Sequence, residues 1–390
     1  MYKLFLFFFL ISSLAANAQA DFSGFESETG GVVLAHSPKS TKKFVGSPSI
    51  CILPDGVYVA SHDLFGLWDD KKLGPVTKVY RSTDKGKTWE YTADLTNQYW
   101  STLFVLHKKL YILGTNNNGG SVTIRRSEDG GRTWTVPVDA HTGILADDHQ
   151  YHCGPVPVIV HKGRVWRAME DCSGPKPVWG KMFRALMMSA PVGADLLKAS
   201  NWTFSNRLPY DSTYLDGKFG GWLEGNAVVD PNGNIVNILR VDYREQDGEK
   251  AAIIRVSEDG KTSVFDPEAD FINFPGGCKK FSIRYDPKSK KYWTVSNYVP
   301  QQFKGGNVER TRNTQAISWS TDLINWHVHR IVLQHPDVHK HGFQYLDWQF
   351  DGNDIIALSR TAYDDGMGGA DNQHNANMIS FHRFKNFRKK

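Results

Sequence analysis

Side chains that can transfer protons or bind anions recur where apolar runs of the chain begin or end. The set comprises His62, Asp63, His152, Glu170, Asp171, Glu224, Arg240, Lys279, Lys280, Tyr298, Gln344, Tyr345 and Arg360. Acids, imidazoles and phenols at such positions can take part in general acid–base catalysis, and Arg or Lys can bind a carboxylate. Brought together, they suit a polar, charged ligand. The plainer alternative for each is a core or rim residue that bonds to turn amides.

A repeated turn marks the elements that must position these side chains. Ser82-x-Asp84-x-Gly86-x-Thr88-Trp89 recurs as Ser127-x-Asp129-x-Gly131-x-Thr133-Trp134. Weaker copies occupy 257–262 and 320–326, and Asn201-Trp202 ends a further degenerate one. In such a tight β-turn Asp accepts from turn amides, Gly takes a positive φ and Trp packs beneath. We therefore assign the repeat a structural role and no catalytic one.

Strand–turn–strand patterns surround these turns. Residues 49–53 and 57–60 are apolar runs joined by Pro54-Asp55-Gly56. The pattern recurs at 103–113, 156–167, 227–240, 281–295 and 345–358. This spacing predicts an all-β fold, a β-propeller of about six four-stranded blades over 21–390 as one domain, with seven blades as the alternative. The segment 31–36 is expected to pair with the last blade, which would close the ring and remove exposed edges.

The N-terminus predicts export. Lys3 precedes an apolar stretch, residues 4–14, and small residues at 16, 18 and 20 suit cleavage. We predict a signal peptide at 1–20 and a secreted or periplasmic mature chain that makes no membrane contact; the alternative is a membrane anchor. The net charge of +5 is modest and only the tail from Lys385 to Lys390 is strongly basic, so no nucleic-acid partner is expected.

The chain has four cysteines, which would lie in an oxidising compartment after export. Cys153 and Cys172 flank an expected hairpin and are a candidate disulfide, although three full pairings of the four cysteines exist. None of the four lies in a recognisable nucleophile motif.

The repeated turn resembles the Asp-box of sialidase-like propellers. By that resemblance Asp63 falls near the sialidase acid/base, Glu224 and Arg240 match its Glu and second Arg, and Tyr345 lies near its Tyr nucleophile. Gly46-Ser47-Pro48 stands where the first arginine of that family's carboxylate clamp would be. Lys279 or Lys280 replaces the third, and lysine is a poor geometric substitute for arginine. Exo-α-sialidase activity is therefore an alternative and not the leading hypothesis.

A second resemblance covers most of the mature chain. Residues 50–66, 151–170, 221–240 and 279–286 are similar to bacterial propeller α-L-rhamnosidases of the glycoside hydrolase family 145 type and to related ulvan and rhamnose–glucuronate lyases. The resemblance implies an enzyme that cleaves a rhamnose–glucuronate linkage in a plant or algal polysaccharide, most simply by hydrolysis. Its partner would be an oligo- or polysaccharide that contains uronic acid.

The resemblance leaves two chemistries open, besides a non-catalytic sugar-binding propeller. A uronate lyase would use His152 as base, Tyr298 or Tyr345 as acid and Arg240 to neutralise the carboxylate. Glu170-Asp171-Cys172 lacks the second histidine of those lyases, and Glu224 replaces their tyrosine. The rhamnosidase resemblance implies a single catalytic histidine away from the usual pocket, for which His36 and His62 are the candidates. Arg360, Lys279, Lys280 and Tyr298 are expected to bind substrate in either case.

A structural zinc is the one candidate metal. Cys278, His341 and His374 are the preferred ligands, from a group that also includes His335 and His339, since one thiolate with two or three imidazoles is a plausible tetrahedral set. The lyases that the chain resembles also hold a structural zinc. The alternative is a free buried thiol with hydrogen-bonded loop histidines. No cofactor is expected to be required for catalysis.

Overall fold

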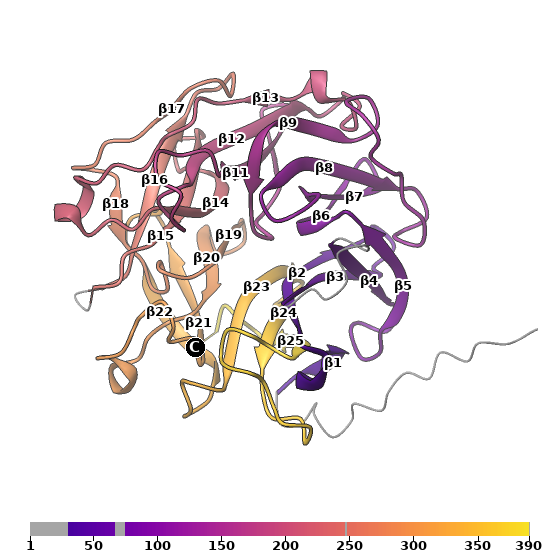
Figure 1. Ribbon diagram of the computed structural model, residues 1–390, viewed down its shortest axis with the longest axis vertical. Coiled ribbons are helices and arrows are strands. Elements are labelled where there is room, and N and C mark those ends of the chain that lie inside the picture. Colours follow the sequence, from indigo (N-terminus) through magenta and orange to yellow (C-terminus); the bar gives the residue numbers. More distant parts are fainter. Residues whose placement is uncertain (1–29, 67–74, 246–247, 390) are drawn as a thin grey trace, which may run out of the picture.

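The structure, a computed structural model, describes residues 30–66, 75–245 and 248–389 of the chain. The predicted signal peptide at 1–20 therefore lies outside the described residues. The described chain is all-β, and its strands radiate around a common centre in a propeller-like arrangement (Figure 1). No helix in this part of the chain is long and apolar enough to cross a membrane.

The strands of the first half are β1 (Val32–His36), β2 (Lys43–Ile52), β3 (Tyr58–Gly66), β4 (Val76–Ser82), β5 (Glu90–Thr96), β6 (Tyr99–Leu106), β7 (Lys109–Thr115), β8 (Gly120–Ser127), β9 (Ile144–His152), β10 (Ile159–His161), β11 (Arg164–Asp171), β12 (Arg184–Pro191) and β13 (Thr203–Phe204). Those of the second half are β14 (Trp222–Val229), β15 (Ile235–Val241), β16 (Lys250–Val256), β17 (Ser263–Val264), β18 (Phe271–Asn273), β19 (Ser282–Asp286), β20 (Lys291–Ser296), β21 (Thr314–Ser320), β22 (His327–Gln334), β23 (Gly342–Asp351), β24 (Asp354–Ala362) and β25 (Met378–Phe384). Short 3-10 turns occupy η1 (Lys39–Thr41), η2 (Ala199–Asn201), η3 (Tyr214–Gly217) and η4 (Gln301–Phe303).

The described strands form five hydrogen-bonded sheets. Three follow chain order from the centre outward: β2 to β5, β14 to β17 with β18 beside β16, and β19 to β22. A fourth runs β23, β24, β25 and β1, and the fifth joins β6 to β13. Each predicted strand pair is an antiparallel hairpin in these sheets. The expected count of six or seven blades stays a prediction.

The eight-stranded sheet arises because β9 pairs with strands on both sides. Its first half pairs with β8 through Ile144 and Ala146, and its last two residues, Tyr151 and His152, pair with β11. One strand thus runs from the rim of the molecule to its centre, which delivers His152 to the inner end of a sheet.

The ring is closed by the N-terminal strand, as predicted. β1 pairs antiparallel with β25, and His36 lies opposite Met378. Between sheets, side chains bond to backbone: Asp347 of β23 accepts from the Ile50 amide of β2 at 3.0 Å, and the Ile283 amide of β19 donates to Asn226 of β14 at 3.0 Å. Hydrogen bonds from side chains to backbone therefore connect neighbouring inner strands around the centre.

The Asp-box turns have the predicted structure. In the first, Asp84 Oδ1 accepts from the Thr88 amide at 2.9 Å, and Gly86 has φ +87°. Trp89, 5% exposed, packs edge-on against Phe381 beneath the turn. The turn at 127–134 repeats the same bonds around Asp129, and the degenerate copies keep the serine–aspartate bond at 257–259 and 320–322.

The candidate disulfide is not formed, because all four cysteines are free thiols in the structure. The β9–β11 register pairs His152 with Glu170, and the Cys172 amide bonds to the Gln150 carbonyl. Cys172 is thus level with position 150 and not with Cys153. Cys153 is three positions from residue 150 along the chain, and an odd separation along a strand directs two side chains to opposite faces of a sheet.

Candidate functional site

A cavity of about 600 Å³ lies where the inner strands of several sheets meet. Its walls come from β2, β3, β6, β9, β14, β23 and β24 and from the loops beside them. The lining residues are Gly46, Ser47, Asp63, Phe65, Gly66, Pro75, Tyr99, Trp100, Asn117, Asn118, His152, Cys153, Trp179, Glu224, Tyr345, Arg360 and His374. Five sequence-predicted catalytic or substrate-binding residues are therefore brought together: Asp63, His152, Glu224, Tyr345 and Arg360.

β-Bulges in four inner strands supply part of this lining. The register shifts by one residue between Gly46 and Ser49, Tyr99 and Thr102, Trp222 and Gly225, and Gln344 and Asp347. Each bulge contains one cavity residue: Ser47, Trp100, Glu224 or Tyr345. Ser47, Trp100 and Tyr345 also have positive φ values of 47°, 47° and 54°. A bulge re-aims a side chain that regular alternation would direct elsewhere.

Glu224, Arg240 and Tyr345 form a buried hydrogen-bonded group. Arg240 Nη1 donates to Glu224 Oε2 at 3.0 Å, and the Tyr345 hydroxyl donates to Glu224 Oε1 at 3.1 Å. Burial is the largest single influence on Glu224 and would raise its pKa, but the charge and hydrogen bond of Arg240, together with His152, lower the pKa overall. Glu224 is thus a carboxylate placed to accept the phenolic proton. Arg240 itself does not line the cavity and acts through Glu224.

Asp63 presents a carboxyl group of the opposite character. It is buried, and its partners are the Thr77 and Ser47 hydroxyls and the Trp100 amide at 2.7 Å. Burial raises its pKa to about 7, and these neutral donors lower it only in part. A carboxyl that is largely protonated near neutral pH can serve as a general acid.

His152 reaches the cavity at the end of β9. Its Nδ1 lies 3.2 Å from Glu170 Oε2, and its ring stacks on Phe183 with centroids 4.5 Å apart. Glu170 also accepts from the Gly225 amide at 3.1 Å, and burial raises the pKa of this carboxyl. The imidazole is therefore held in one orientation by a carboxyl on one side and aromatic rings on the other.

Arg360 is a buried cation at the cavity wall. Its guanidinium lies over the rings of Phe65 and Tyr345, with its carbon 4.4 and 5.1 Å from the two centroids, and donates to the His374 carbonyl. Among the described residues no carboxylate lies within ion-pair distance, and its buried Nε has no hydrogen-bond partner. Burial lowers its pKa to about 9, which still leaves the group charged at neutral pH.

Arg360 lies close to Gly46, in the segment where the comparison with sialidases leads one to look for an arginine and the chain has none. A Cβ built on Gly46 would lie 3.9 Å from Arg360 Nη1 and 3.0 Å from the Phe65 ring. The guanidinium therefore reaches the space beside Gly46 from β24 rather than from β2. The sequence has no arginine at 46–48 and gave no sign of this approach.

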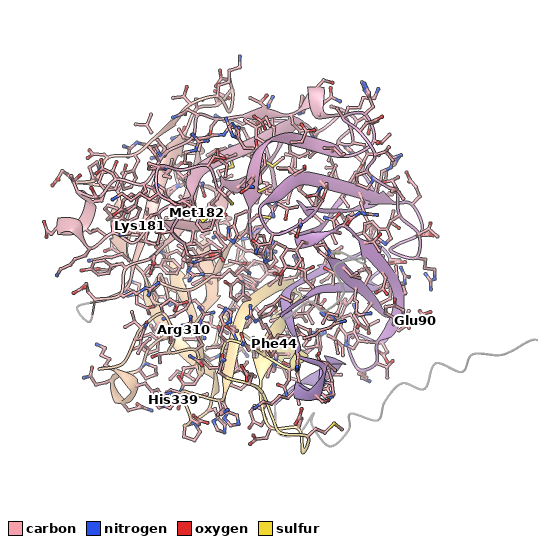
Figure 2. The ribbon with its side chains drawn as sticks, viewed as in Figure 1. Phe44, Glu90, Lys181, Met182, Arg310 and His339 are labelled. Carbon is pink, nitrogen blue, oxygen red and sulfur yellow. The ribbon has the colours of Figure 1, made fainter. Side chains whose placement is uncertain are left out.

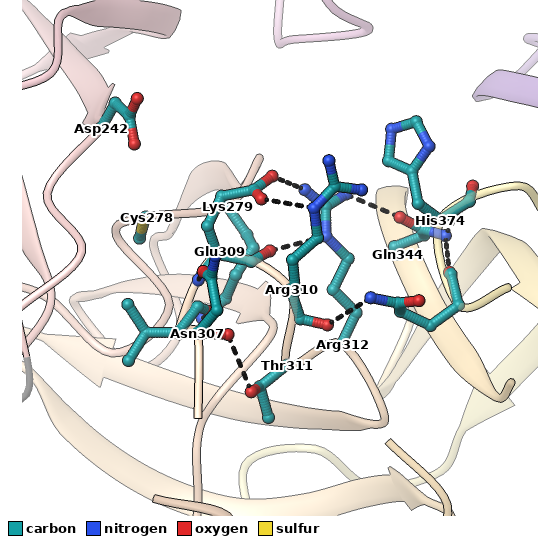
Figure 3. Close-up of polar contacts among 12 residues, drawn as sticks. Asp242, Cys278, Lys279, Asn307, Glu309, Arg310, Thr311, Arg312, Gln344 and His374 are labelled. Carbon is teal, nitrogen blue, oxygen red and sulfur yellow. Dashed lines mark hydrogen bonds and ion pairs between the residues drawn. The ribbon is translucent and has the colours of Figure 1, made fainter. Parts of the chain in front are cut away.

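A cluster of arginines around Glu309 adds positive charge and was missed in the sequence (Figure 3). Glu309 pairs with Arg312, with Arg310 Nε at 3.0 Å and with Arg240 Nη2 at 3.5 Å. Burial would raise the pKa of Glu309, but these three cations lower it to about 2. Arg312 also donates to Gln344 beside the Tyr345 bulge, at 2.6 Å. A signal in the sequence that could have revealed this cluster is the densely charged run between two strands, Glu309-Arg310-Thr311-Arg312.

Three residues expected to bind substrate lie elsewhere. Lys279 is buried against Glu249 and bonds to the Val308 carbonyl at 3.0 Å. Lys280 donates to the Leu346 carbonyl at 2.6 Å, and burial lowers its pKa to about 8. Tyr298 lines a separate hollow of about 280 Å³. None of the three lines the central cavity.

The two histidines considered for a remote catalytic role are buried outside the cavity. His36 Nε2 lies 2.8 Å from Asp365, whose carboxylate also accepts from the Gly369 amide. His62 stacks on Tyr80 with centroids 5.6 Å apart, and burial lowers its pKa to about 4. His62 precedes Asp63 on β3, and adjacent strand residues point to opposite faces.

The candidate zinc ligands are not assembled. Within 30–66, 75–245 and 248–389 no three His, Cys, Asp or Glu side chains are grouped to hold a metal ion. Cys278 is a buried thiol whose pKa burial raises to about 11, and His341 lies between Asp337 at 3.0 Å and Asp364 at 3.3 Å. His374 lines the cavity, on the other side of the Arg310–Arg312 pair from Cys278 in Figure 3. The three residues do not fit one tetrahedral site.

No family model and no curated protein matches the sequence. Among solved structures, the chain is similar to the Penicillium chrysogenum α-L-arabinanase complexed with arabinobiose, with 13% identity over 92% of this chain and 98% of that chain and a TM-score of 0.55. It is also similar to the Hadza microbial sialidase Hz136, with 15% identity over 91% and 68% of the two chains and a TM-score of 0.58. A protein of unknown function from Dyadobacter fermentans gives 15% identity over 91% and 97% and a TM-score of 0.57.

These likenesses define the fold class, which is a sialidase-like β-propeller. Within it, the central cavity of this chain combines a protonatable carboxyl, a phenol bonded to a carboxylate, an oriented imidazole and a guanidinium that has no carboxylate partner among the described residues.

Proposed function

We propose that the protein is a glycoside hydrolase that cleaves a rhamnose–glucuronate linkage in a plant or algal polysaccharide from its central cavity. The observation that carries the proposal is the pairing of Tyr345 with Glu224 beside Arg360. The first two form a nucleophile with its base, and the third offers a charge to a uronate carboxylate. The solved α-L-arabinanase and sialidases with similar folds support a carbohydrate ligand.

The reaction follows from the two carboxyls. Asp63, protonated near neutral pH, donates its proton to the glycosidic oxygen as the bond to the anomeric carbon breaks. Tyr345 gives its proton to Glu224 while its oxygen bonds to the same carbon. A water molecule then attacks that carbon, loses a proton to Asp63 and displaces the tyrosine oxygen, which recovers its proton from Glu224. The net change is hydrolysis, with both groups restored.

A uronate lyase is the second candidate, because His152 also faces the cavity. In that reaction His152 would take the C5 proton of the uronate, Tyr345 would protonate the leaving oxygen and Arg360 would stabilise the carboxylate. The Glu170 contact, which fixes the imidazole, supports such a role.

Product analysis separates the candidates. Mature protein is incubated with oligosaccharides from gum arabic and with ulvan. Free rhamnose without the ultraviolet absorbance of an unsaturated uronate supports hydrolysis; that absorbance supports elimination. Binding without either product would contradict both reactions and leave a sugar-binding propeller.

Variants then test the assigned residues. Tyr345→Phe and Glu224→Gln are expected to lower kcat by about 10²- to 10⁴-fold. The circular dichroism and thermal unfolding of Tyr345→Phe should stay close to wild type, whereas Glu224→Gln should also unfold at a lower temperature, because it removes a carboxylate from the buried Arg240. His36→Gln and His62→Gln serve as matched controls outside the cavity. Loss of turnover in a folded His36 or His62 variant, with Tyr345→Phe still active, would place the chemistry at a remote histidine and contradict the proposed site.

We also propose an exported protein of six blades. If the eight-stranded sheet is divided at β9, its halves and the other four sheets make six units around the centre. Seven radial sheets in a crystal structure would contradict this count. N-terminal sequencing of the protein from its natural source tests export, and a mature N-terminus after residue 18 or 20 is the expected result.

A further inference from the structure

The cavity has two chemically different ends. Arg360 and His374 come from β24 and the segment that precedes β25, whereas His152 and Trp179 come from the region around β9, β11 and β12. In Figure 1 these two groups of strands lie on opposite sides of the centre. One end is thus cationic and the other aromatic.

Trp179 is the unusual residue at the aromatic end. It lines the cavity yet is 48% exposed, although tryptophan rings of this chain such as Trp166 and Trp222 are 1% exposed. It meets Phe183 and His152 edge-to-face, at interplanar angles of 85° and 88°. Among the described residues no ring stacks on Trp179 and no cation lies over it. An exposed indole face at a cavity wall is a surface on which a sugar ring can stack.

The loop that carries Trp179, residues 172–183, is held in place before any ligand arrives. The Gly174 amide bonds to the Met182 carbonyl at 2.8 Å, and the Met182 amide bonds to the Val178 carbonyl at 2.9 Å. At its end Gly180, with φ +81°, approaches Gly221 so closely that a Cβ on Gly221 would lie 2.1 Å from Gly180. Lys181 and Met182 mark the loop in Figure 2. A preorganised platform costs little ordering entropy on binding.

We propose that Trp179 is the platform of a second sugar subsite, so that the cavity takes at least two linked sugars. The uronate carboxylate would lie at Arg360, and the neighbouring sugar would place its apolar C–H face on the indole. This inference rests on the proposed function and deepens it, because it assigns one residue to recognition of the chain beyond the uronate. Trp179 binds and does not react.

The test compares two ligands in calorimetric titrations, with every protein carrying Tyr345→Phe so that the substrate is not cleaved: glucuronate, and a rhamnose-capped glucuronate oligosaccharide from gum arabic. Trp179→Ala should weaken oligosaccharide binding about tenfold or more and leave glucuronate binding unchanged. Trp179→Phe should restore most of the affinity, because it keeps an aromatic face. Arg360→Gln should weaken both ligands. Quenching of tryptophan fluorescence by the oligosaccharide should be reduced in Trp179→Phe.

Val178→Ala is the matched control, since Val178 is exposed in the same loop and does not line the cavity. It should bind both ligands as wild type does. Unchanged oligosaccharide binding by Trp179→Ala, or equal weakening of both ligands, would overturn the platform even if the enzyme hydrolyses its substrate. The tenfold selective loss without any cleavage would overturn the proposed reaction and leave the platform standing.

Discussion

Asp63 and Glu224 are both buried in the same cavity, but their neighbours give them opposite roles. Glu224 accepts from the Arg240 guanidinium, whose charge holds its pKa below the usual range. Asp63 has only neutral donors, so desolvation dominates and raises its pKa to about 7. Two carboxyls whose environments separate their pKa values are a general way to have an acid and a base at one pH.

The Asp63 assignment predicts a pH dependence. Activity should fall as pH rises through about 7, because the carboxyl then loses the proton that it must donate. Asp63→Asn should lower kcat about 10²-fold or more for glycosides with poor leaving groups and abolish this alkaline limb. A pH–rate profile of kcat/KM on gum arabic oligosaccharides measures both effects.

The same pKa shift has a consequence for stability. Because the pKa of Asp63 in the folded state exceeds its unfolded value, the stabilisation is complete below the unfolded pKa and is lost as pH rises through about 7. Wild type should therefore lose more stability than Asp63→Asn between about pH 4 and pH 7, the interval between the unfolded and the folded pKa. Parallel alkaline limbs in the two proteins would contradict the assignment of this group.

At the scale of elements, the Asp-box turns and the bulges serve different ends. Asp129, in the turn that follows β8, accepts from the Arg132 and Thr133 amides at 3.0 and 2.9 Å. These bonds hold a turn, and none of the turn residues lines the central cavity. The bulges instead interrupt the inner strands and direct single residues inward.

Asp129→Ala should therefore reduce stability without affecting turnover. Loss of the capping bonds should lower the free energy of unfolding by about 1–2 kcal/mol, as measured by urea denaturation, with kcat unchanged. Glu128→Ala is the neighbouring control, because Glu128 forms exposed ion pairs with Lys109 and Arg126 that contribute about 0–1 kcal/mol. A large fall in kcat for Asp129→Ala would contradict a purely structural role.

The elements also show where sequence reasoning succeeded. Alternating and apolar runs correctly predicted every hairpin that forms an inner strand pair, because burial of a strand face leaves a local signature. The bulges at Ser47, Trp100 and Tyr345 leave none, since a positive φ at a residue other than glycine has no clear local code. Asp63, Glu224 and Tyr345 were nevertheless identified, through their resemblance to sialidase residues.

At the scale of the whole molecule, ring closure depends on β1. Leu34 is 7% exposed and belongs to the cluster that also contains Ile50, Tyr58, Trp89 and Phe381. The cluster joins the first sheet to the last, so the N-terminal strand ties the two ends of the chain together.

Leu34→Asp should open this closure. An unpaired charge buried in the cluster should lower the free energy of unfolding by about 3 kcal/mol or more and make β25 accessible to limited proteolysis. Val264→Asp, the same kind of change at a site that is 51% exposed on β17, should have little effect. Equal stability of the two variants would show that β1 is not needed to close the ring.

The sequence by itself determined the all-β hairpins and the Asp-box turns, because each depends on contacts between residues close in the chain or on a periodic pattern of burial. It also indicated the closing strand, although that strand pairs with residues near the other end of the chain. Only the tertiary structure decided which charged residues meet. Lys279 lies next to Glu309 in space, because it bonds to the Val308 carbonyl. Even so, Lys279 pairs with Glu249, whereas Glu309 pairs with Arg240, Arg310 and Arg312. Arg360 approaches Gly46 from more than 300 positions away along the chain, as the residue numbers show. Such long-range geometry depends on the ring closing, and no local pattern encodes it.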